Sequence, residues 1–281
     1  MKAVASLVCG QLAVGLIFGL LLTHAFISRP IYAQGILAPP RTENLREAAI
    51  KKWEDDIQKL EALDDAQPGS PHHILVVGSS SVRRWDTIER DLAPFQVIQR
   101  GFGGAKWSDL AFYIDRLVVP HDFQAVVIFI ANGIAGKEND QDPDDMAVWA
   151  EFVVERVRQH QPEAAIVLVE VTPSRARYDV WPVIQDVNVH LRRIALSTDN
   201  TYTVNTSEHF LTPDGQPRES LFVDDKLHLN DEGYKLWGKL IRRRLDEVLR
   251  LQQLYPVATP SDVSAQRDSA SGEAAGPSPA S

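Results

Sequence analysis

The chain has 281 residues and a mass of 31.3 kDa, with 44% hydrophobic and 24% charged residues. This composition supplies enough apolar side chains for one sizeable core, which excludes a coiled coil, a collagen and a wholly disordered protein. The 29 basic and 38 acidic residues give a formal charge of -9 and a pI near 5.4, so no nucleic acid is expected as a partner.

Residues 1–38 are predicted to be a signal peptide or a membrane anchor. Residues 3–22 carry no charge, and a helix of about 20 residues rising roughly 1.5 Å each would just cross a bilayer. The same run fits a signal peptide with small-residue cleavage sites at residues 23–25 or 31–33. Both alternatives predict that the rest of the chain is exported. Cys9, the single cysteine, lies in this run, which excludes an internal disulfide and a thiolate metal site.

Residues 39–70 are predicted to form an amphipathic helix and a linker that pack on the main domain. Apolar residues recur there at intervals of three and four, as on one face of a helix: Trp53, Ile57, Leu60 and Leu63. The prolines and the glycine at residues 67–71 end this pattern. Near the other end of the chain, residues 256–281 are rich in Ser, Ala and Pro, which predicts a disordered tail.

Between these segments, short apolar runs alternate with longer amphipathic stretches. The runs predict buried strands at residues 74–77, 96–98, 125–130, 165–171 and 201–204. The stretches predict helices at residues 108–117, with Ser108 as the N-cap, and at residues 146–159, 181–196 and 231–251. The alternation predicts an α/β domain at residues 71–255, with a doubly wound, mainly parallel five-stranded sheet and helices on both faces. In such a sheet, reactive groups gather beyond the carboxyl ends of the strands.

Three candidate motifs follow the first three predicted strands. Gly78-Ser79-Ser80-Ser81 either supplies a nucleophile or forms a turn and a helix cap. The glycines at residues 101–104 either expose backbone N–H groups toward a ligand or form a tight turn, and the dinucleotide-binding spacing Gly-x-Gly-x-x-Gly is absent. Asn132-Gly133 either places an amide at the edge of the sheet or forms an ordinary turn.

A carboxylate and a histidine precede the last predicted helix. Asp225 and His228 are three residues apart, so the carboxylate can fix the imidazole tautomer and leave the other ring nitrogen as a base. The alternative is an acidic helix-capping segment with a solvated histidine. Together, the four motifs offer a nucleophile, two kinds of oxyanion donor and an oriented base, which are the groups that acyl transfer to serine requires.

From about Trp53 to Leu249, the chain resembles the SGNH hydrolases, also called the GDSL esterase/lipase superfamily. Its first block is similar to the branch that reads Gly-Ser-Ser-Ser-x-Arg-x-Trp, and residues 172–182 and 225–237 are similar to the same branch. The resemblance implies a flavodoxin-like SGNH fold and a metal-independent serine esterase that needs no cofactor. Carried over by motif, it implies Ser80 as the nucleophile, Gly104 and Asn132 as oxyanion donors, and Asp225 and His228 as the remaining triad members.

One block departs from the family pattern. The family usually has Gly-x-Asn-Asp, whereas this chain has Ile130-Ala131-Asn132-Gly133. The bulky Ile130 can crowd the oxyanion pocket, and Gly133 lacks a carboxylate that would help to hold the loop. An alternative source of the amide is the Glu-Asn-Asp run at residues 138–140, which stands several residues beyond the strand.

Further side chains are candidates for the walls of the site. Arg83 and Arg84 follow the serines by one turn, and they either hold an anionic substrate or pair with Asp109 or Asp115. Two of the six tryptophans are expected to line a cleft: Trp107 and Trp181.

The sequence therefore predicts an exported serine hydrolase that cleaves carboxylic esters through an acyl-enzyme. Its expected partners are ester-bearing small molecules, lipids or acylated glycans, together with the membrane if residues 3–22 are retained. Two alternatives stay open. One is a catalytically weak relative that binds an acylated envelope polymer, which the altered block around Asn132 favours. The other is an enzyme that moves acetyl groups onto or off a sugar.

Overall fold

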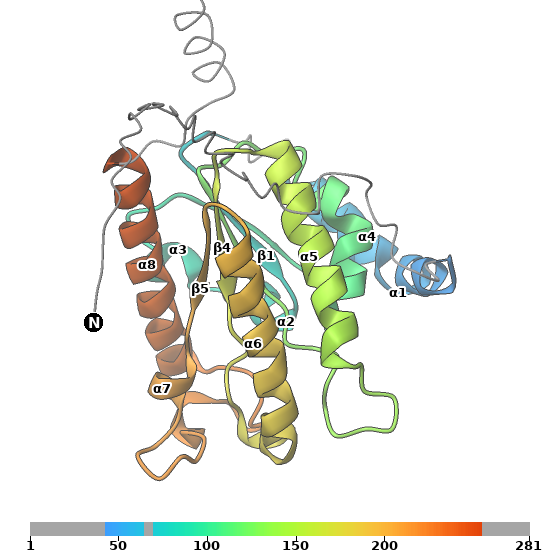
Figure 1. Ribbon diagram of the computed structural model, residues 1–281, viewed down its shortest axis with the longest axis vertical. Helices are drawn as coiled ribbons and strands as arrows, with labels where there is room; N and C mark the ends of the chain where they lie inside the picture. Colours follow the sequence, from blue (N-terminus) through green and yellow to red (C-terminus); the bar gives the residue numbers. More distant parts are fainter. Residues whose placement is uncertain (1–42, 65–69, 255–281) are drawn as a thin grey trace, which may run out of the picture. The chain divides into compact units, whose positions relative to one another are not determined.

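A computed structural model of the protein describes residues 43–64 and 70–254 (Figure 1). The segment predicted as a signal peptide or anchor, residues 1–38, and the segment predicted as a tail, residues 256–281, lie outside the described residues. Among the helices that are described, none has both the length and the apolar character that a membrane span needs.

Five parallel strands form the central sheet in the order β2-β1-β3-β4-β5. They are β1 (Ile74–Gly78), β2 (Val97–Gly101), β3 (Ala125–Phe129), β4 (Ala165–Val169) and β5 (Thr201–Val204). Because β1 has β2 on one side and β3 on the other, the direction of winding reverses between β1 and β3. Gly78 pairs with Phe129, so these two strands end at the same level of the sheet. The predicted doubly wound parallel sheet is confirmed.

Helices connect the strands and cover the sheet (Figure 1). The long ones are α1 (Glu43–Glu61), α4 (Trp107–Leu117), α5 (Pro143–His160), α6 (Trp181–Ser197) and α8 (Asp231–Leu254). Each of them overlaps a helix that the sequence predicts. The short ones were not predicted: α2 (Ser80–Arg83), α3 (Ile88–Asp91), α7 (Ser207–Phe210) and the 3₁₀ turns η1 (Arg175–Val180) and η2 (Glu219–Leu221).

Two apolar layers enclose the sheet. Alternate strand residues such as Leu75 and Val77 pack in one layer with α1, α4, α5 and α6. Their neighbours Ile74 and Val76 pack in the other layer with α8. Burial on both faces explains why the inner strands read as continuous apolar runs rather than as an alternating pattern. The helices on the two faces confirm the predicted three-layer arrangement.

Several element boundaries differ from the prediction by one to three residues, and those of α4 and β2 involve polar or charged side chains. Ser108 is not the N-cap of α4, because the helix begins at Trp107 and Ser108 is buried in its first turn. The backbone N–H of Lys106 donates to Asp109 Oδ2 at 2.9 Å, so a carboxylate rather than the serine hydroxyl closes the start of this helix. β2 continues past its predicted end, because residues 99–101 pair with residues 76–78 of β1. The charged side chain of Arg100 is buried there and donates to Asp64 at 2.6 Å.

The first helix packs over the glycine-rich loop that follows β2. Trp53 of α1 is buried edge-to-face against Phe102, with 5.7 Å between the ring centroids. Gly103 has φ near 39°, and a Cβ atom there would lie 1.8 Å from the Trp53 ring, so this position requires glycine. The contact fixes the backbone on one side of Gly104, the predicted oxyanion donor.

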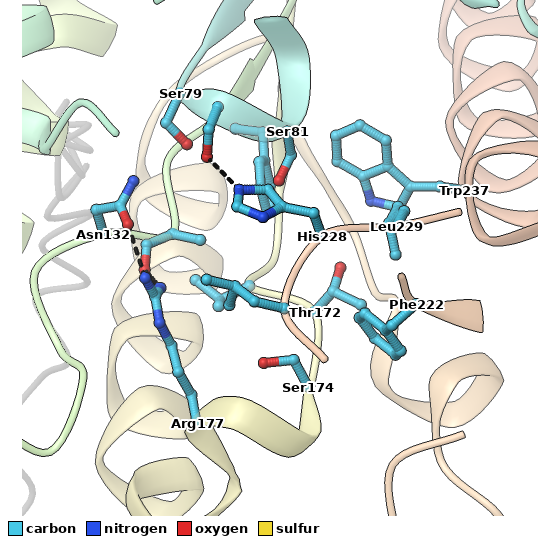
Figure 2. Close-up of a pocket in the computed structure, with 15 residues that line it drawn as sticks. Ser79, Ser81, Asn132, Thr172, Ser174, Arg177, Phe222, His228, Leu229 and Trp237 are labelled. Carbon is cyan, nitrogen blue, oxygen red and sulfur yellow. Dashed lines mark hydrogen bonds between the residues drawn. The ribbon is translucent and has the colours of Figure 1, made fainter. Parts of the chain in front are cut away.

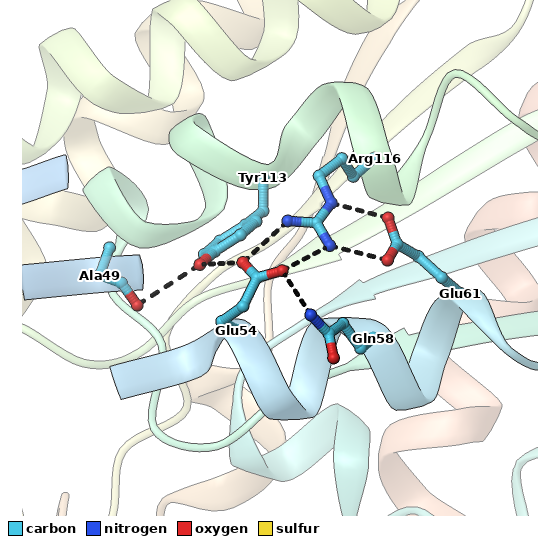
Figure 3. Close-up of polar contacts among 6 residues, drawn as sticks. All are labelled: Ala49, Glu54, Gln58, Glu61, Tyr113 and Arg116. Atoms are coloured by element: carbon cyan, nitrogen blue, oxygen red, sulfur yellow. Dashed lines mark hydrogen bonds and ion pairs between the residues drawn. The ribbon is translucent and has the colours of Figure 1, made fainter. Parts of the chain in front are cut away.

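Arg116 of α4 ties the first helix to the domain (Figure 3). Its guanidinium donates to Glu61 at 2.6 and 2.7 Å and to Glu54 at 2.9 and 3.0 Å. The Tyr113 hydroxyl donates to Glu54 as well, at 3.3 Å. The hydrogen bonds from Arg116 lower the pKa of both Glu54 and Glu61.

Arg116→Ala is expected to lower the Tm by about 3–6 °C at pH 7, because two carboxylates of α1 lose the cation that they share. Arg116 lowers the folded-state pKa of both glutamates, so its stabilising effect is present above their unfolded pKa and is lost as the pH falls through the folded pKa. The Tm difference from the parent protein should therefore shrink between pH values of about 7 and 3. Thermal unfolding followed by circular dichroism measures both effects.

Arg156→Ala is the matched control for this prediction. Arg156 donates to one carboxylate, that of Asp115, at 2.6 and 3.1 Å on the surface between α4 and α5. Its loss should change the Tm by about 1 °C or less, since isolated exposed ion pairs contribute little. Equal losses in the two variants would contradict a special role for Arg116 in docking α1.

Candidate active site

Ser80 lies at the carboxyl edge of the sheet, immediately beyond β1. The backbone N–H of Ser79 donates to the Phe129 carbonyl at 3.1 Å, so the pairing of β1 with β3 continues one residue past the strand. The chain then turns into α2, where the N–H of Arg84 bonds to the Ser80 carbonyl at 2.9 Å. This strand-to-helix turn presents the Ser80 side chain at the point where the winding of the sheet reverses.

His228 forms hydrogen bonds with both Ser80 and Asp225, and the bond to Ser80 is drawn in Figure 2. Nε2 of His228 lies 2.9 Å from Ser80 Oγ, and Nδ1 lies 2.7 Å from Asp225 Oδ2. The other carboxylate oxygen, Oδ1, accepts the backbone N–H groups of Leu227 and His228, each at 2.9 Å. The structure thus brings together side chains from distant parts of the sequence, since Ser80 and His228 are 148 residues apart.

The Asp225 carboxylate is held in its ionised form. Burial acts to raise its pKa, but hydrogen bonds from the His228 side chain and from the backbone N–H groups of His228 and Leu227 outweigh that effect and keep the pKa well below its usual range. An ionised carboxylate at Nδ1 favours the tautomer in which Nδ1 carries the proton and Nε2 accepts one from Ser80.

Arg84 lies beside this carboxylate, with Nη1 3.6 Å from Asp225 Oδ2. The predicted pairing of the two arginines with Asp109 or Asp115 is wrong, because those carboxylates serve other partners. Asp109 caps the start of α4, and Asp115 binds Arg156. Arg84 therefore belongs to the electrostatic surroundings of the triad.

The two predicted oxyanion donors lie next to each other. A Cβ atom built on Gly104 would lie 3.6 Å from Asn132 Nδ2, so the glycine backbone faces the amide nitrogen directly. One proton of that nitrogen is directed at the Ala105 carbonyl, 3.3 Å away. Asn132 and Ser80 line one pocket. The carboxyl ends of β2 and β3 therefore bring the amide and the glycine loop to the same edge as the serine.

The altered residues around Asn132 do not block this pocket. Ile130 is fully buried in the core layer with α4 and α5, and it is not among the residues that line the pocket. The alternative amide source at residues 138–140 is placed differently: Asn139 is exposed, and the Asp140 carboxylate accepts backbone N–H groups at residues 135–137. The structure therefore favours Asn132 as the amide that faces Ser80.

The pocket has an apolar side and a polar side (Figure 2). The apolar side chains are Phe129, Ala131, Val171, Phe222, Leu227, Leu229 and Trp237. The polar ones, besides Ser80, His228 and Asn132, are Ser79, Ser81, Thr172, Ser174 and Arg177. The enclosed space is about 30 Å³. The prediction that Trp107 and Trp181 line the cleft is wrong, since both are buried in the core layer with α4 and α6, where they support the fold.

A wider groove adjoins the pocket, and Leu229 borders both. The groove has a volume of about 730 Å³ and is lined mainly by polar and charged side chains, including Arg83, Arg84, Asp86 and Glu232. The two arginines that follow the serines thus face this groove. The site therefore combines a small, partly apolar pocket at Ser80 with a larger polar groove beside the triad.

Arg177 is a site residue that was not singled out from the sequence, although it stands in the Thr172–Arg177 segment that carries the resemblance. It belongs to η1, and its guanidinium donates to Asn132 Oδ1 at 2.7 Å and to the Ala131 carbonyl. Burial lowers the pKa of Arg177, and the charge of Asp140 partly opposes this shift. Sequence separation hid the contact, since Arg177 and Asn132 are 45 residues apart.

These groups together can carry out nucleophilic acyl chemistry. The serine hydroxyl has a base at hydrogen-bond distance, the base has an orienting carboxylate, and the Asn132 amide lines the same pocket as the serine. Within residues 43–64 and 70–254, no cluster of three or more His, Cys, Asp or Glu side chains is placed to hold a metal ion.

Comparison with known proteins yields one family match and a set of similar structures. Residues 68–236 match the GDSL-like Lipase/Acylhydrolase family. The fold is similar to that of a protein from Streptococcus pneumonia described as a platelet activating factor, with 20% identity, a TM-score of 0.61, and 72% of this chain and 96% of that chain covered. A comparison with curated proteins finds no match.

Two further solved structures share the fold. A GDSL-like lipase from Bacteroides thetaiotaomicron is 17% identical, with a TM-score of 0.54 and coverage of 70% of this chain and 97% of that chain. A carbohydrate esterase family 3 protein from Talaromyces cellulolyticus is 13% identical, with a TM-score of 0.51 and coverage of 63% and 98%. At these identities, the likeness is one of fold.

Proposed function

The chain belongs to the GDSL-like lipase/acylhydrolase family of ester-hydrolysing enzymes, and we propose that it cleaves short-chain carboxylic esters with Ser80 as the nucleophile. One observation carries this proposal: the hydrogen-bonded series Asp225–His228–Ser80, with distances of 2.7 and 2.9 Å. The first-block pattern Gly-Ser-Ser-Ser-x-Arg-x-Trp at residues 78–85 places the chain, in this proposal, in the branch of the family that carries it.

In the proposed mechanism, Ser80 Oγ attacks the ester carbonyl carbon while its proton passes to His228 Nε2. The C–O bond to the alcohol then breaks, and the alcohol leaves with the proton that His228 returns. Water attacks the resulting acyl-enzyme, gives a proton to His228, and releases the acid as that proton returns to Ser80. The backbone N–H groups of Ser80 and Gly104 and the Asn132 amide stabilise the oxyanion in both steps.

The dimensions of the site support a short acyl group on a larger polar alcohol. The space beside Ser80, about 30 Å³, is far smaller than the adjoining groove, so it suits a short acyl group better than a long chain. The polar groove of about 730 Å³ on the far side of Leu229 offers room for the alcohol. We therefore favour acetylated polar molecules, including glycans, as substrates over long-chain lipids.

The position of Asn132 also supports an active enzyme over the alternative of an inactive binding protein. That alternative rested on the possibility that Ile130 displaces the amide. Because Asn132 faces Gly104 and Ile130 is buried in the core, the altered block retains a usable donor.

Export of the domain is part of the proposal. The apolar run at residues 3–22 supports either a cleaved signal peptide or a retained anchor, with the esterase domain on the periplasmic or extracellular side. Esters of envelope polymers would be accessible to the enzyme in that location.

The test uses the full chain and a series of p-nitrophenyl esters with acyl groups of two, four and eight carbons. We expect kcat/KM to be highest for the acetyl ester, and a fluorophosphonate to label Ser80, as located by mass spectrometry of the modified peptide. A folded protein that hydrolyses none of these esters and leaves Ser80 unlabelled would contradict the proposed function. A preference for the eight-carbon ester would retain the mechanism and reject the short acyl pocket.

A further inference from the structure

The oxygen of the Asn132 amide accepts a hydrogen bond from a part-buried cation. Arg177 Nη2 donates to Asn132 Oδ1 at 2.7 Å, and Nη1 donates to the carbonyl of the preceding residue, Ala131. Figure 2 shows the guanidinium against the oxygen of the amide, with the nitrogen on the opposite side. Arg177 therefore holds both the side chain and the backbone of the loop that follows β3.

The chemistry of the two groups allows one orientation of the amide. An arginine side chain has donors and no acceptor, so it can bind the oxygen of the asparagine and not its NH₂ group. With the oxygen at Arg177, the nitrogen lies beside Gly104, where one of its two protons is directed at the Ala105 carbonyl and the other is available to an oxyanion. A rotation of the amide by 180° would place NH₂ against the guanidinium and lose the hydrogen bond.

The charge of Arg177 has a further consequence for the same amide. Hydrogen bonds from an ionised donor are stronger than neutral ones, and each bond in a chain polarises the next. A cation at Oδ1 draws electron density from the amide and makes the Nδ2–H protons better donors. Asp140, the carboxylate whose charge acts on Arg177, accepts the backbone N–H groups of residues 135–137, whereas the guanidinium hydrogen bonds go to Ala131 and Asn132.

A part-buried cation that contacts an amide and a carbonyl has a free-energy cost as a purely structural device. Transfer of a charge out of water carries a large free-energy cost unless an opposite charge or several hydrogen bonds compensate for it. A part-buried cation at a pocket that contains the proposed nucleophile is the kind of arrangement found at functional sites. The residue that follows Asn132 is Gly133, which has no side chain to hold the amide in place of Arg177.

We propose that Arg177 is a positioning residue that fixes and polarises Asn132 as the side-chain oxyanion donor. This inference rests on the proposed esterase function. It gives η1 a part in transition-state stabilisation. This segment lies outside the triad and outside the glycine-rich loop. Arg177 does not touch the reacting atoms in this arrangement and acts through the amide alone.

The test is a double-mutant cycle between Arg177 and Asn132, measured as kcat and KM for p-nitrophenyl acetate. Arg177→Met, which keeps the aliphatic length and removes the donors, should lower kcat about 10- to 100-fold with little change in KM, because the loss falls on the transition state. In an Asn132→Ala background, the same substitution should lower kcat less than about 3-fold, since the amide on which Arg177 acts is gone.

Three controls accompany the cycle. Arg177→Lys keeps the charge but cannot form both hydrogen bonds, to Ala131 and to Asn132, so it should retain more activity than Arg177→Met. It also allows a second double-mutant cycle if the methionine variant does not fold. Arg175→Met changes an exposed arginine of the same turn and should leave kcat unchanged. Circular dichroism and the Tm of each variant report on folding.

The outcomes separate this inference from the proposed function. If Arg177→Met loses the same factor with and without the Asn132 amide, or keeps full kcat, the positioning role is wrong while the esterase stands. If the parent protein has no esterase activity, or if Ser80→Ala retains it, the proposed function fails first. Non-additive losses with an unchanged KM support the positioning role.

Discussion

Replacement of Ser80 by alanine is expected to lower kcat/KM for p-nitrophenyl acetate by about 10⁴- to 10⁶-fold, with no loss of folded structure. The variant removes the nucleophile, and the remaining groups can assist only direct attack by water. The fold should be unaffected because backbone hydrogen bonds hold the strand-to-helix turn at Ser80, from Ser79 N–H to the Phe129 carbonyl and from Arg84 N–H to the Ser80 carbonyl. Initial rates and the Tm, measured on the same preparation, check both statements.

The neighbouring serine provides the control. Ser81 lies one residue further along the same pocket, but His228 Nε2 is bonded to Ser80 Oγ. Ser81→Ala is therefore expected to lower kcat/KM by less than about 10-fold. The fluorophosphonate should label the Ser81 variant and fail to label the Ser80 variant. A large loss of activity in Ser81→Ala, with activity retained in Ser80→Ala, would contradict the assignment of Ser80 and identify Ser81 as the nucleophile. His228 would then have to contact Ser81 in place of Ser80.

The architecture was predictable because the strands are buried on both faces. Runs such as residues 74–77 and 125–130 contain almost no polar residue, so their type and order could be deduced without tertiary information. The end of β2 was predicted poorly, because Arg100 interrupts the apolar pattern of this strand. That arginine is buried through its bond to Asp64, a partner 36 residues away that no local pattern reveals.

The convergence of the site residues also follows from topology. Parallel strands end at one edge of the sheet, so the loops after β1, β2 and β3 bring Ser80, Gly104 and Asn132 together once the strand order is known. Side-chain contacts across the site could not be predicted in this way. Arg84 reaches Asp225 and Arg177 reaches Asn132 through pairings that depend on how two loops meet in space.

The tryptophans illustrate the same limit. Trp107 follows the glycine-rich loop in the sequence, which suggested a place in the cleft, yet the first turn of α4 directs it into the core. Trp237 lies on α8, in the block at residues 225–237 that resembles the family, and it lines the pocket although it was not expected to form the cleft. Proximity in sequence to a motif is therefore a weak guide to which large side chains form the walls.

Asp225→Asn is expected to lower kcat by about 10⁴-fold at pH 7 while KM changes little. The amide has nearly the shape of the carboxylate, and its oxygen can still accept the backbone N–H groups of Leu227 and His228 that Oδ1 binds now. Its NH₂ group would then face His228 Nδ1, which must become the acceptor. The proton moves to Nε2, and the ring can no longer accept the proton of Ser80.

Asp224→Asn is the matched control. Asp224 is the adjacent exposed acid, so its substitution removes the same charge from the same loop. If the role of Asp225 were only to supply negative charge near the site, the two variants would lose similar activity. We expect the loss at Asp224 to stay below about 3-fold, since exposed surface charges are screened by solvent and salt.

The Asp225 variant should also differ from the parent protein in its stability against pH. The folded-state pKa of Asp225 is held below its unfolded value, so the carboxylate stabilises the fold above the unfolded pKa, and this stabilisation is lost as the pH falls through the folded pKa. Asp225→Asn should therefore lower the Tm at pH 7 and converge with the parent in strong acid. An activity loss at pH 7 without any change in Tm would mean that the carboxylate orients His228 but does not stabilise the loop.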